Sequence, residues 1–536
     1  MSSKADFIIR NARIFTGDKT NPLAEAVAVK GNRIVFVGTN DGANEFQGES
    51  TRVIDGEGRT VTPGFIDSHF HLLWGSIWIG SAQLYEARNM DDVKKALQTF
   101  AAQNQTNEWV DGRGIKYGII PSRQALDEIV SDRPVYINAY DGHTSWANTK
   151  ALEMAGILQP GKEASGVGMV VRDENGLATG ELRETAINLV SDLLPEPSDA
   201  RKRELLKMAI AKINATGVTS VHNMNGDMEE LMVYAALEDA GEMTLRVYTP
   251  FWIKPGMSEE VLQEAAEMAK IQGEYARGGA AKFFMDGVWE SYTALNLDPY
   301  ADNAEAQPDG IFSLEHFTRM AAACDKLGLQ IFVHCCGDGA VRRVLDGYEA
   351  VQTLNGKRDS RHRVEHIEVI HPDDLPRFKE LGVIASMQTS HAPFSMSEGD
   401  VWPARTGSER WPRSFAWRDI KNAGAHLALG SDWTVAPFDP MINLHVAMNR
   451  ELWSPTDPDQ RLTLEECILG YTRDAAYAEF KENEKGQIKE SYLADLVLFT
   501  HDLFALKSED IMTAKSALTM VNGKVVFETP LKSVRL

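Results

Sequence analysis

The feature that most constrains the fold is an alternation of short apolar segments with helical segments through the centre of this 536-residue chain. Eight of the apolar segments have the composition of buried parallel strands; they are 65–71, 217–223, 245–250, 280–286, 329–334, 362–367, 383–388 and 426–432. Helical patterns fall between several of them, at 201–215, 260–272, 314–326 and 340–355. Because eight β/α repeats close into a barrel, the sequence predicts an α/β fold of the TIM (β/α)8 type.

Both ends of the chain carry short strands joined by tight turns. Near the start, strands are predicted at 6–15, 26–29, 33–37, 51–54 and 60–61, with a hairpin turn at Gly31-Asn32. Near the end, strands are predicted at 496–500, 517–521 and 524–527, with a turn at Asn522-Gly523. We therefore predict one small β-sandwich built from residues 1–62 and 485–536, beside a barrel domain of residues 63–484.

The connection between the first two predicted barrel strands is unusually long, at about 145 residues. Long connections in compact domains usually carry function or structure of their own. We predict that residues 75–200 form an insertion that caps the barrel mouth and helps to shape the substrate pocket.

Charge and cysteine content restrict the partners and the compartment. The formal net charge is −22, and such a field repels polyanions, so we expect neither nucleic acid nor membrane as a partner. Four cysteines do not make a disulfide scaffold, and no signal-peptide or membrane-spanning pattern is evident. These features predict a cytoplasmic protein. Barrels with such appendages often pair, so a homodimer is an open alternative to a monomer.

Residues that can bind metal stand at the ends of the predicted strands. His69 and His71 end the first strand, and side chains two residues apart on a strand point to the same face. Two converging imidazoles can hold one metal ion, although an isolated pair of this kind is weak evidence. His334, His366 and Asp432 end three further strands, and parallel barrel strands bring their carboxyl ends to one face. The whole set therefore predicts a metal site, whereas a single such histidine is more often a hydrogen-bonded core residue.

Lys282 stands on an apolar predicted strand, where burying an ammonium group has a desolvation cost. As a carbamate formed with CO2, this side chain would become an anionic ligand whose two oxygens can bridge two cations. The alternative is a buried ion pair with Asp286 or another acid.

The ordered set of these residues resembles the binuclear type of the amidohydrolase superfamily. The sequence around them resembles its YtcJ-like branch, which includes N-substituted formamide deformylase. The matching stretches span nearly the whole chain: TPGFIDSHFHL (62–72), DGHTSWANTKAL (141–152), AAKFFMDG (280–287), VHCCGDGAV (333–341), RVEHIEVI (363–370), GVIASMQTSH (382–391), LALGSDWTVAPFDP (427–440) and YLADLVLF (492–499).

The resemblance implies two divalent metal ions, usually zinc, bridged by hydroxide and by carbamylated Lys282. By the family pattern, His69, His71 and Asp432 would hold one ion, and His334 and His366 the other. The hydroxide would attack the carbonyl carbon of a small N-acyl or N-formyl substrate, and the C–N amide bond would break. Asp432 would accept the proton and pass it to the leaving amine.

Several further residues are candidate contacts for the substrate. His143 lies in the predicted insertion, where this branch often has a histidine facing the substrate, and it could stabilise the oxyanion. Its alternative is a loop histidine that caps backbone groups. His222 and Gln388 end the second and seventh strands, His391 follows the seventh, and Trp289 lies near a strand end. The alternative for each is ordinary packing.

Two other functions compete with amide hydrolysis. A mononuclear deaminase of the same superfamily typically has a glutamate three residues after the histidine of the fifth strand, but Gly337 occupies this position after His334. A non-catalytic scaffold relative would be expected to have replaced its metal ligands, yet all six positions are intact. We therefore expect a metal-dependent amidohydrolase that acts on carbon–nitrogen bonds other than peptide bonds.

Overall fold

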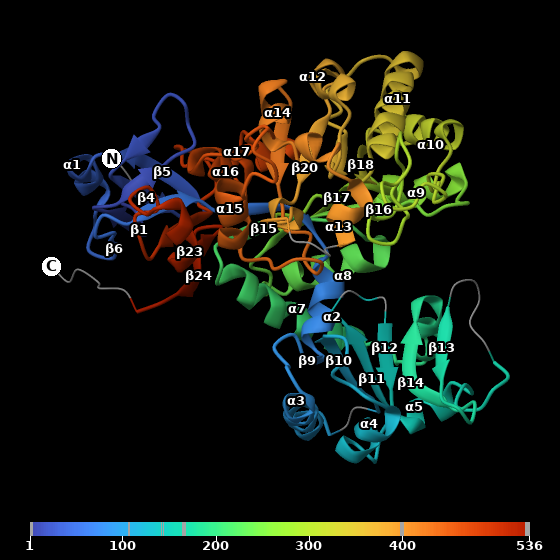
Figure 1. Cartoon of the computed structure of the whole chain (residues 1–536). Helices are drawn as coiled ribbons and strands as arrows, with labels where there is room; N and C mark the ends of the chain where they lie inside the picture. The colour runs from blue at the N-terminus through green and yellow to red at the C-terminus, as the bar shows by residue number, and fades with distance from the viewer. Residues whose placement is uncertain are drawn as a thin grey trace. The chain divides into compact units, whose positions relative to one another are not determined.

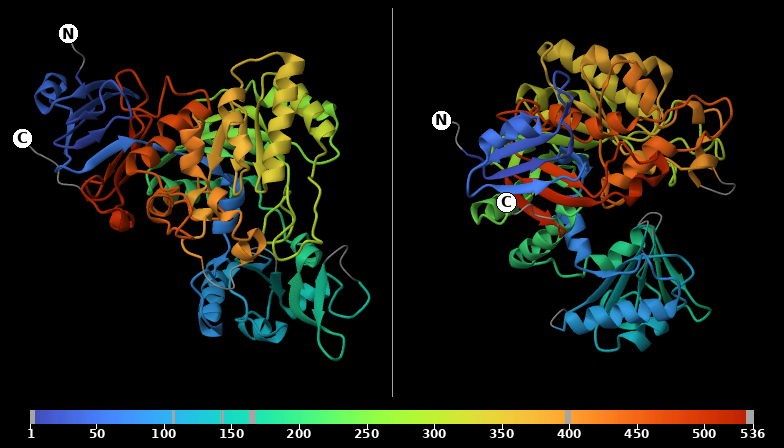
Figure 2. Two further views of the ribbon diagram at one scale, coloured as in Figure 1. Left: turned by 45° about the horizontal axis from the view of Figure 1, so that its top comes forward. Right: turned by 90° about the vertical axis from the view of Figure 1, so that its left-hand side faces the viewer.

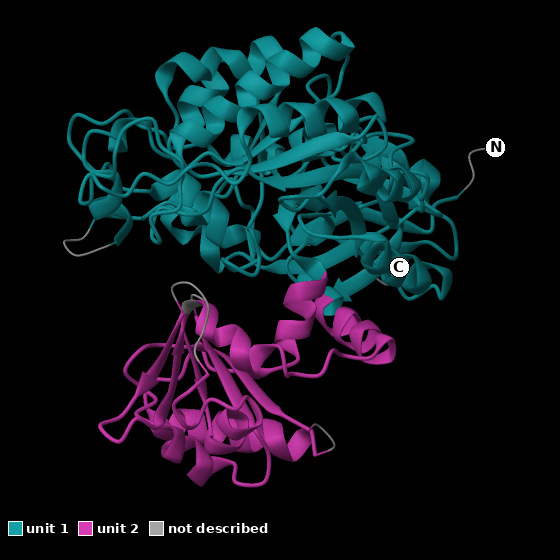
Figure 3. Cartoon of the chain, turned by 90° about the vertical axis from the view of Figure 1, so that its right-hand side faces the viewer, with its two compact units in different colours: residues 1–72, 210–536 teal, residues 73–209 magenta. Residues whose placement is uncertain are grey.

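The computed structural model describes residues 4–105, 108–140, 142, 144–162, 168–396 and 401–530. The chain divides into two compact units, one of residues 1–72 with 210–536 and one of residues 73–209 (Figure 3). This division does not decide the predicted boundaries of sandwich, barrel and insertion, which stay predictions. Among the described residues, none of the helices combines the length and the hydropathy that a membrane span requires.

The larger unit contains a sheet of eight parallel strands in the order β21-β20-β19-β18-β17-β16-β15-β8 (Figure 1). They are β8 (Phe65–Phe70), β15 (Val218–Asn223), β16 (Arg246–Trp252), β17 (Ala276–Phe284), β18 (Gln330–Cys335), β19 (Arg363–His366), β20 (Ile384–Met387) and β21 (His426–Leu429). The first and last strands of this order contact each other, and the Asp432 N–H donates to the carbonyl of His69 at 2.8 Å. The sheet is therefore nearly closed, and the predicted TIM-barrel fold is confirmed.

Helices alternate with these strands. They include α8 (Met228–Asp239), α9 (Leu262–Met268), α10 (Leu314–Lys326), α11 (Asp338–Asn355), α12 (Leu375–Leu381), α14 (Trp417–Asn422), α15 (Pro440–Asn449), α16 (Leu464–Gly470) and α17 (Arg473–Ala478). Helix α10 shows why the sequence folds this way. The side chain of Ser313 caps its first turn by accepting from His316 N at 3.2 Å. Its buried residues Phe317, Met320 and Cys324 recur at the spacing of one helix face.

Two smaller sheets of the same unit are built from the ends of the chain. One has the order β5-β4-β1-β6, from β5 (Arg33–Gly38), β4 (Ala26–Lys30), β1 (Phe7–Arg10) and β6 (Arg52–Asp55). The other has the order β24-β23-β22-β7-β2-β3, from β24 (Lys524–Glu528), β23 (Ser516–Val521), β22 (Leu496–Phe499), β7 (Thr60–Pro63), β2 (Arg13–Phe15) and β3 (Leu23–Ala24). Strands from the two ends lie side by side because β7 pairs antiparallel with β22 (Figure 2).

These end sheets share one apolar core, which contains Ile14, Val61, Leu496 and Leu518. The predicted single strand 6–15 is two strands, β1 and β2. Asn11 lies between them with φ 53°, a left-handed conformation that interrupts an extended strand.

The smaller unit has a mixed six-stranded sheet of its own, in the order β13-β14-β12-β11-β10-β9 (Figure 1). Its strands are β9 (Ala82–Gln83), β10 (Val110–Ile115), β11 (Val135–Ala139), β12 (Thr144–Ala147), β13 (Met169–Arg172) and β14 (Ala178–Arg183). Helix α3 (Met90–Gln103) buries Val93, Leu97 and Phe100 in the same core as Val110 and Ile137. The long connection after β8 thus carries a folded layer. That it caps the barrel mouth stays a prediction.

Candidate metal centre

The barrel strands place the candidate ligands at or next to their carboxyl ends. His69 lies on β8 and His71 directly follows it, while Lys282, His334 and His366 lie on β17, β18 and β19. Asp432 follows β21 after a three-residue step. All six side chains are buried, and Lys282 has no exposed surface although it carries an ionisable amine.

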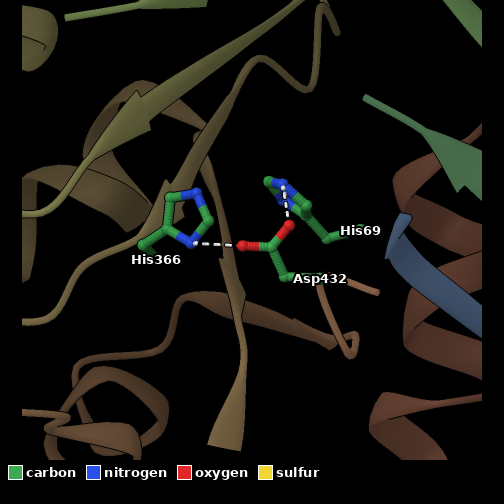
Figure 4. A group of neighbouring side chains, drawn as sticks. All are labelled: His69, His366 and Asp432. Atoms are coloured by element: carbon green, nitrogen blue, oxygen red, sulfur yellow. Dashed lines mark ion pairs between the residues drawn. The ribbon is translucent and has the colours of Figure 1, made fainter. Parts of the chain in front are cut away.

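The carboxylate of Asp432 faces four imidazoles. Its Oδ1 lies 3.4 Å from Nε2 of His69 and 3.2 Å from Nε2 of His71. Its Oδ2 lies 3.9 Å from Nδ1 of His366 and 3.7 Å from Nε2 of His391. Figure 4 shows His69 and His366 on either side of this carboxylate, and the ligand atoms of these three residues lie within 4.8 Å of one another. Imidazole and carboxylate groups in this arrangement are the donors that zinc and similar divalent metals prefer.

The polar atoms of this cluster fit a bound cation. Buried polar atoms in proteins nearly always have hydrogen-bond partners. Nδ1 of His366, Nε2 of His391, Oδ1 of Asp432 and Nζ of Lys282 are buried without one. Two of these atoms are imidazole nitrogens and a third is an oxygen of the carboxylate that they face, and such lone-pair donors are the ligands of a divalent metal ion.

Three of the histidines are oriented by hydrogen bonds from the ring nitrogen opposite the site. Nδ1 of His71 lies 2.6 Å from Oδ1 of Asn225, and Nδ1 of His69 lies 2.7 Å from Oε2 of Glu365. Nε2 of His334 lies 3.0 Å from the carbonyl oxygen of Gly287. An acceptor at one ring nitrogen places the proton there, so the other nitrogen carries the lone pair that a metal needs.

Burial and neighbouring charge set the protonation states of the cluster. Burial lowers the pKa of His69 and His366 well below the usual range, and that of His334 to about 4. Burial also lowers the pKa of Lys282 to about 8, against the attraction of nearby carboxylates. Burial alone would raise the pKa of Asp432, but the facing imidazoles hold it below its ordinary value. Neutral imidazoles and an ionised carboxylate are the forms in which these groups bind metal.

The backbone is strained at two of the candidate ligands. His366 and Asp432 have φ of 69° and 58°, and Ile367, next to the first, has φ of 51°. This left-handed conformation is uncommon outside glycine and is least favourable for a β-branched residue such as Ile367. Strained residues of this kind cluster at functional sites, where the surrounding structure holds them.

Two buried aspartates that were not predicted as site residues, Asp67 and Asp286, support the loops of the site. Oδ1 of Asp67 accepts from the N–H of His69 at 3.2 Å and from that of Ser431 at 2.9 Å, so it joins β8 to the turn before Asp432. Burial raises the pKa of Asp67 to about 7. Its position two residues before His69 was the signal in the sequence that could have found it.

Asp286 has a similar supporting role beside β18. Its carboxylate accepts from the N–H groups of Leu295 at 2.9 Å, Cys336 at 3.0 Å and Gly337 at 2.9 Å. Burial raises the pKa of Asp286 to about 7. Within the part of the chain that the structure describes, Lys282 forms no ion pair with Asp286 or with another acid, so the predicted alternative for this lysine is not observed.

The candidate substrate contacts differ in where they lie. His391 is brought to Asp432, and Gln388 is 1% exposed with neither amide atom hydrogen-bonded. Nδ1 of His222 lies 2.8 Å from Nη1 of Arg363, and its Nε2 lies 3.4 Å from Glu479, so its contacts are with these groups of the barrel interior.

Trp289 is fully buried, and its Nε1 donates to the carbonyl of Cys336 at 3.3 Å. His143 lies outside the described residues. The roles in substrate binding that were assigned to His143, His222, Trp289, Gln388 and His391 stay predictions.

The chain is thus a (β/α)8 barrel protein with a candidate metal centre, formed by histidines, a lysine and an aspartate at the strand ends. The chain belongs to the amidohydrolase family, whose profile matches residues 52–527. The predicted family is therefore confirmed.

Three curated relatives match nearly the whole chain. Protein LONG AFTER FAR-RED 3 of Arabidopsis thaliana is 30% identical, over 98% of this chain and 92% of its own. The putative amidohydrolase YtcJ of Bacillus subtilis is 28% identical, over 96% and 97%. N-substituted formamide deformylase of Arthrobacter pascens is 27% identical, over 98% and 99%. These relatives support the YtcJ-like branch.

One of the similar solved structures is an uncharacterized metal-dependent hydrolase from Pyrococcus furiosus, with a TM-score of 0.75 and 24% identity. The match covers 92% of this chain and 98% of that one, and it supports the barrel fold.

Proposed function

We propose that this protein is a metal-dependent hydrolase that cleaves the C–N amide bond of a small N-acyl or N-formyl substrate. The observation that carries the proposal is the carboxylate of Asp432, which faces His69 and His71 with one oxygen and His366 and His391 with the other. The name of the deformylase relative supports a C–N bond as the target.

We assign two divalent ions, with zinc as the expected metal, to this cluster. His69, His71 and Asp432 would hold one ion, and His334 and His366 the other. The ring centroids of His334 and His366 are 4.4 Å apart, which supports a shared ion for that pair. Lys282 as a carbamate would bridge the two ions, and its buried, unpaired Nζ supports this assignment.

The chemistry follows from the groups in place. A divalent ion held there would polarise the scissile carbonyl and make water nucleophilic at neutral pH. Asp432 would take one proton from the attacking water and deliver it to the leaving nitrogen as the C–N bond breaks. Water is consumed, and a carboxylic acid and an amine are released. The facing imidazoles hold the pKa of Asp432 below its ordinary value, which keeps the carboxylate ionised before attack.

The test combines metal analysis with product analysis. Protein purified without added metal is analysed for metal content, then assayed for amine release from formamides, acetamides, ureas and lactams. We expect about two ions per chain and amine release from at least one acyl class. One ion per chain with release of ammonia from an aminated ring would favour a mononuclear deaminase, and neither metal nor turnover would favour a scaffold relative.

We further propose that a small molecule is the physiological partner of this site and that the protein acts in the cytoplasm. The net charge of −22 supports a preference against nucleic acid and anionic membranes. Whether two chains pair into a homodimer is measured by size-exclusion chromatography with light scattering.

A further inference from the structure

A line of buried charged groups runs from the candidate metal ligand His69 into the barrel. Nδ1 of His69 lies 2.7 Å from Oε2 of Glu365, whose other oxygen accepts from Nε of Arg363 at 2.8 Å. Nη2 of Arg363 also donates to Oε2 of Glu365 at 3.0 Å. These three side chains are at most 1% exposed. We propose that Glu365 and Arg363 are positioning residues that hold His69 with its Nε2 toward Asp432; this proposal rests on the proposed metal site.

The strand geometry explains why both residues reach His69. Arg363 and Glu365 are two residues apart on β19, so their side chains share one face of the strand. Arg363 donates to the carbonyl of Ser68, the residue before His69, and to the hydroxyl of Ser386 on β20 at 2.9 Å. The guanidinium therefore fixes the backbone that carries His69, while the carboxylate that it orients fixes the ring.

The carboxylate determines which ring nitrogen of His69 can bind metal. An ionised Glu365 can only accept at Oε2, so Nδ1 of His69 carries the proton and Nε2 carries the lone pair. Nε2 is the nitrogen that lies 3.4 Å from Asp432. A carboxylate behind a ligating imidazole also makes the imidazole more basic, and losing such a partner typically weakens metal binding about 10–100-fold.

A purely structural role would make Glu365 no more than the counterion of a buried arginine. Arg363 has other stabilising contacts, because Nδ1 of His222 lies 2.8 Å from its Nη1 and the ring of Phe332 lies 4.1 Å from its central carbon. The two roles differ in their consequence. If Glu365 only balances the charge of Arg363, its loss should affect the unfolding of the protein alone. If Glu365 also holds His69, its loss should affect zinc affinity as well.

The experiment measures zinc affinity by competition with a chelating indicator, and unfolding midpoints of the metal-free protein in urea. The test variant is Glu365→Gln, which keeps the shape and removes the charge. The control is Asp374→Asn, because Asp374 is a buried carboxylate paired with Arg342 and Arg377 at 3.0 Å each, and among the described residues no imidazole pairs with its carboxylate. We expect Glu365→Gln to weaken zinc binding about 10–100-fold, and Asp374→Asn to lower the midpoint while zinc affinity changes by less than about threefold.

His69→Ala provides the readout that a structural role would not move. If Glu365 acts through His69, adding Glu365→Gln to His69→Ala causes no further loss of zinc affinity. In the metal-free protein the midpoint shift of the double variant should be smaller than the two single shifts together. Arg363→Lys keeps the positive charge but loses the two parallel hydrogen bonds to Glu365, so it should cause a smaller loss of zinc affinity than Glu365→Gln. It is the alternative test variant if Glu365→Gln does not fold.

Two results would overturn the proposal: zinc affinity of Glu365→Gln within about threefold of wild type, or an equal loss with and without His69. A wild-type chain that takes up no metal would instead defeat the proposed function. In that case additive midpoint shifts of His69→Ala and Glu365→Gln in the metal-free protein would still overturn the positioning role, and non-additive shifts would support it.

Discussion

His366 and Asp432 face each other with 3.9 Å between Nδ1 and Oδ2, and both have a left-handed backbone. Of the standard side chains other than glycine, asparagine and aspartate adopt this conformation most readily. Asparagine at position 432 should therefore keep the backbone while changing the chemistry.

We expect Asp432→Asn to fold like the wild type and to lose about 10²–10⁴-fold in kcat, the usual contribution of a positioned proton acceptor. Steady-state amine release and circular dichroism check the two halves of this prediction. Asp432→Thr is the comparison, because a β-branched residue at φ 58° should also lower the unfolding midpoint. An unchanged kcat in Asp432→Asn would remove the proton-transfer role.

Lys282 is predicted to be a bridging ligand rather than a packing residue. We expect Lys282→Met to fold but to retain fewer metal ions per chain than wild type, and added formate or acetate should restore part of the activity by supplying two oxygens. The control is Lys485→Met, since Lys485 is equally buried but pairs with Glu479 at 2.7 Å. Metal content by mass spectrometry decides; equal content in Lys282→Met and wild type would refute the bridge.

Gln388 offers both a donor and an acceptor in a buried position. Two residues earlier, Ser386 shares its strand face and accepts from Arg363 at 2.9 Å, so Gln388 lies one step nearer the carboxyl end of the barrel. We expect Gln388→Met to raise KM about tenfold, the value of one hydrogen bond of about 1.4 kcal/mol, with little change in kcat. Gln352→Met, on the outer helix α11, should leave both constants unchanged. A loss confined to kcat would contradict a binding role.

Gly430 allows the last barrel strand to approach the first. A Cβ there would lie 2.6 Å from the backbone nitrogen of His69 and 2.8 Å from Oδ1 of Asp67, which is closer than real Cβ contacts. We expect Gly430→Ala to cost about 1–3 kcal/mol of unfolding free energy and to weaken zinc binding. At Gly48 the three atoms nearest to an added Cβ belong to the side chain of Lys4, the closest at 3.0 Å, so Gly48→Ala should cost less than Gly430→Ala. Urea unfolding and zinc titration of both variants measure the contrast, and equal effects would exclude the steric argument.

Asp325 should make stability depend on pH in the acid range. Burial alone would raise its pKa, but His362 at 3.2 Å, Arg358 at 2.7 Å and Asn355 at 2.9 Å lower it to about 2. A carboxyl pKa below its unfolded value of 3.8 stabilises the fold above that pH, and the contribution is lost as pH falls toward 2.

We therefore expect Asp325→Asn to lower the unfolding free energy by about 2 kcal/mol at pH 7. The difference from wild type should shrink between pH 4 and pH 2, measured by urea unfolding of metal-free protein. His362 does not titrate alike in the two proteins, because Asp325 raises its pKa against the lowering by burial. The same comparison in a His362→Gln background separates this contribution. Asp239→Asn, at an exposed helix end, is the control. A difference that stays constant down to pH 2 would argue against this ion pair.

The order of the barrel elements could be predicted because each strand is a short apolar run between helical patterns. Helix α10 matches the predicted 314–326 to the residue, since Ser313 caps it and Gly328 follows it with φ 79°. Strand β17 begins four residues earlier than predicted. Arg277, Gly278 and Gly279 have no apolar pattern, and only pairing with β16 makes them a strand. Helix α9 (Leu262–Met268) is shorter than the predicted 260–272 at both ends, and a 3-10 turn, η3 (Glu259–Val261), takes its first part.

The metal-binding residue types could be predicted because strand ends in a parallel barrel share one face, but their supports could not. Glu365 lies 296 residues from His69 in the sequence, and Asn225 lies 154 residues from His71. No local pattern encodes such a pairing, because it depends on which strands become neighbours across the barrel. For His222, the position at a strand end predicted a contact with the substrate. In the structure its ring nitrogens lie next to Arg363 and Glu479.

The pairing of β7 with β22 has a consequence for the order of assembly during synthesis. Thr62 on β7 pairs with Val497 on β22, which is synthesised 435 residues later. At ordinary elongation rates this interval is roughly 20–90 s. Until then β7 has an open edge and Ile14 and Val61 lack the apolar cover of Leu496 and Leu518. All eight barrel strands are synthesised before β22, so the sheet built from both ends is the last sheet of this unit that can be completed.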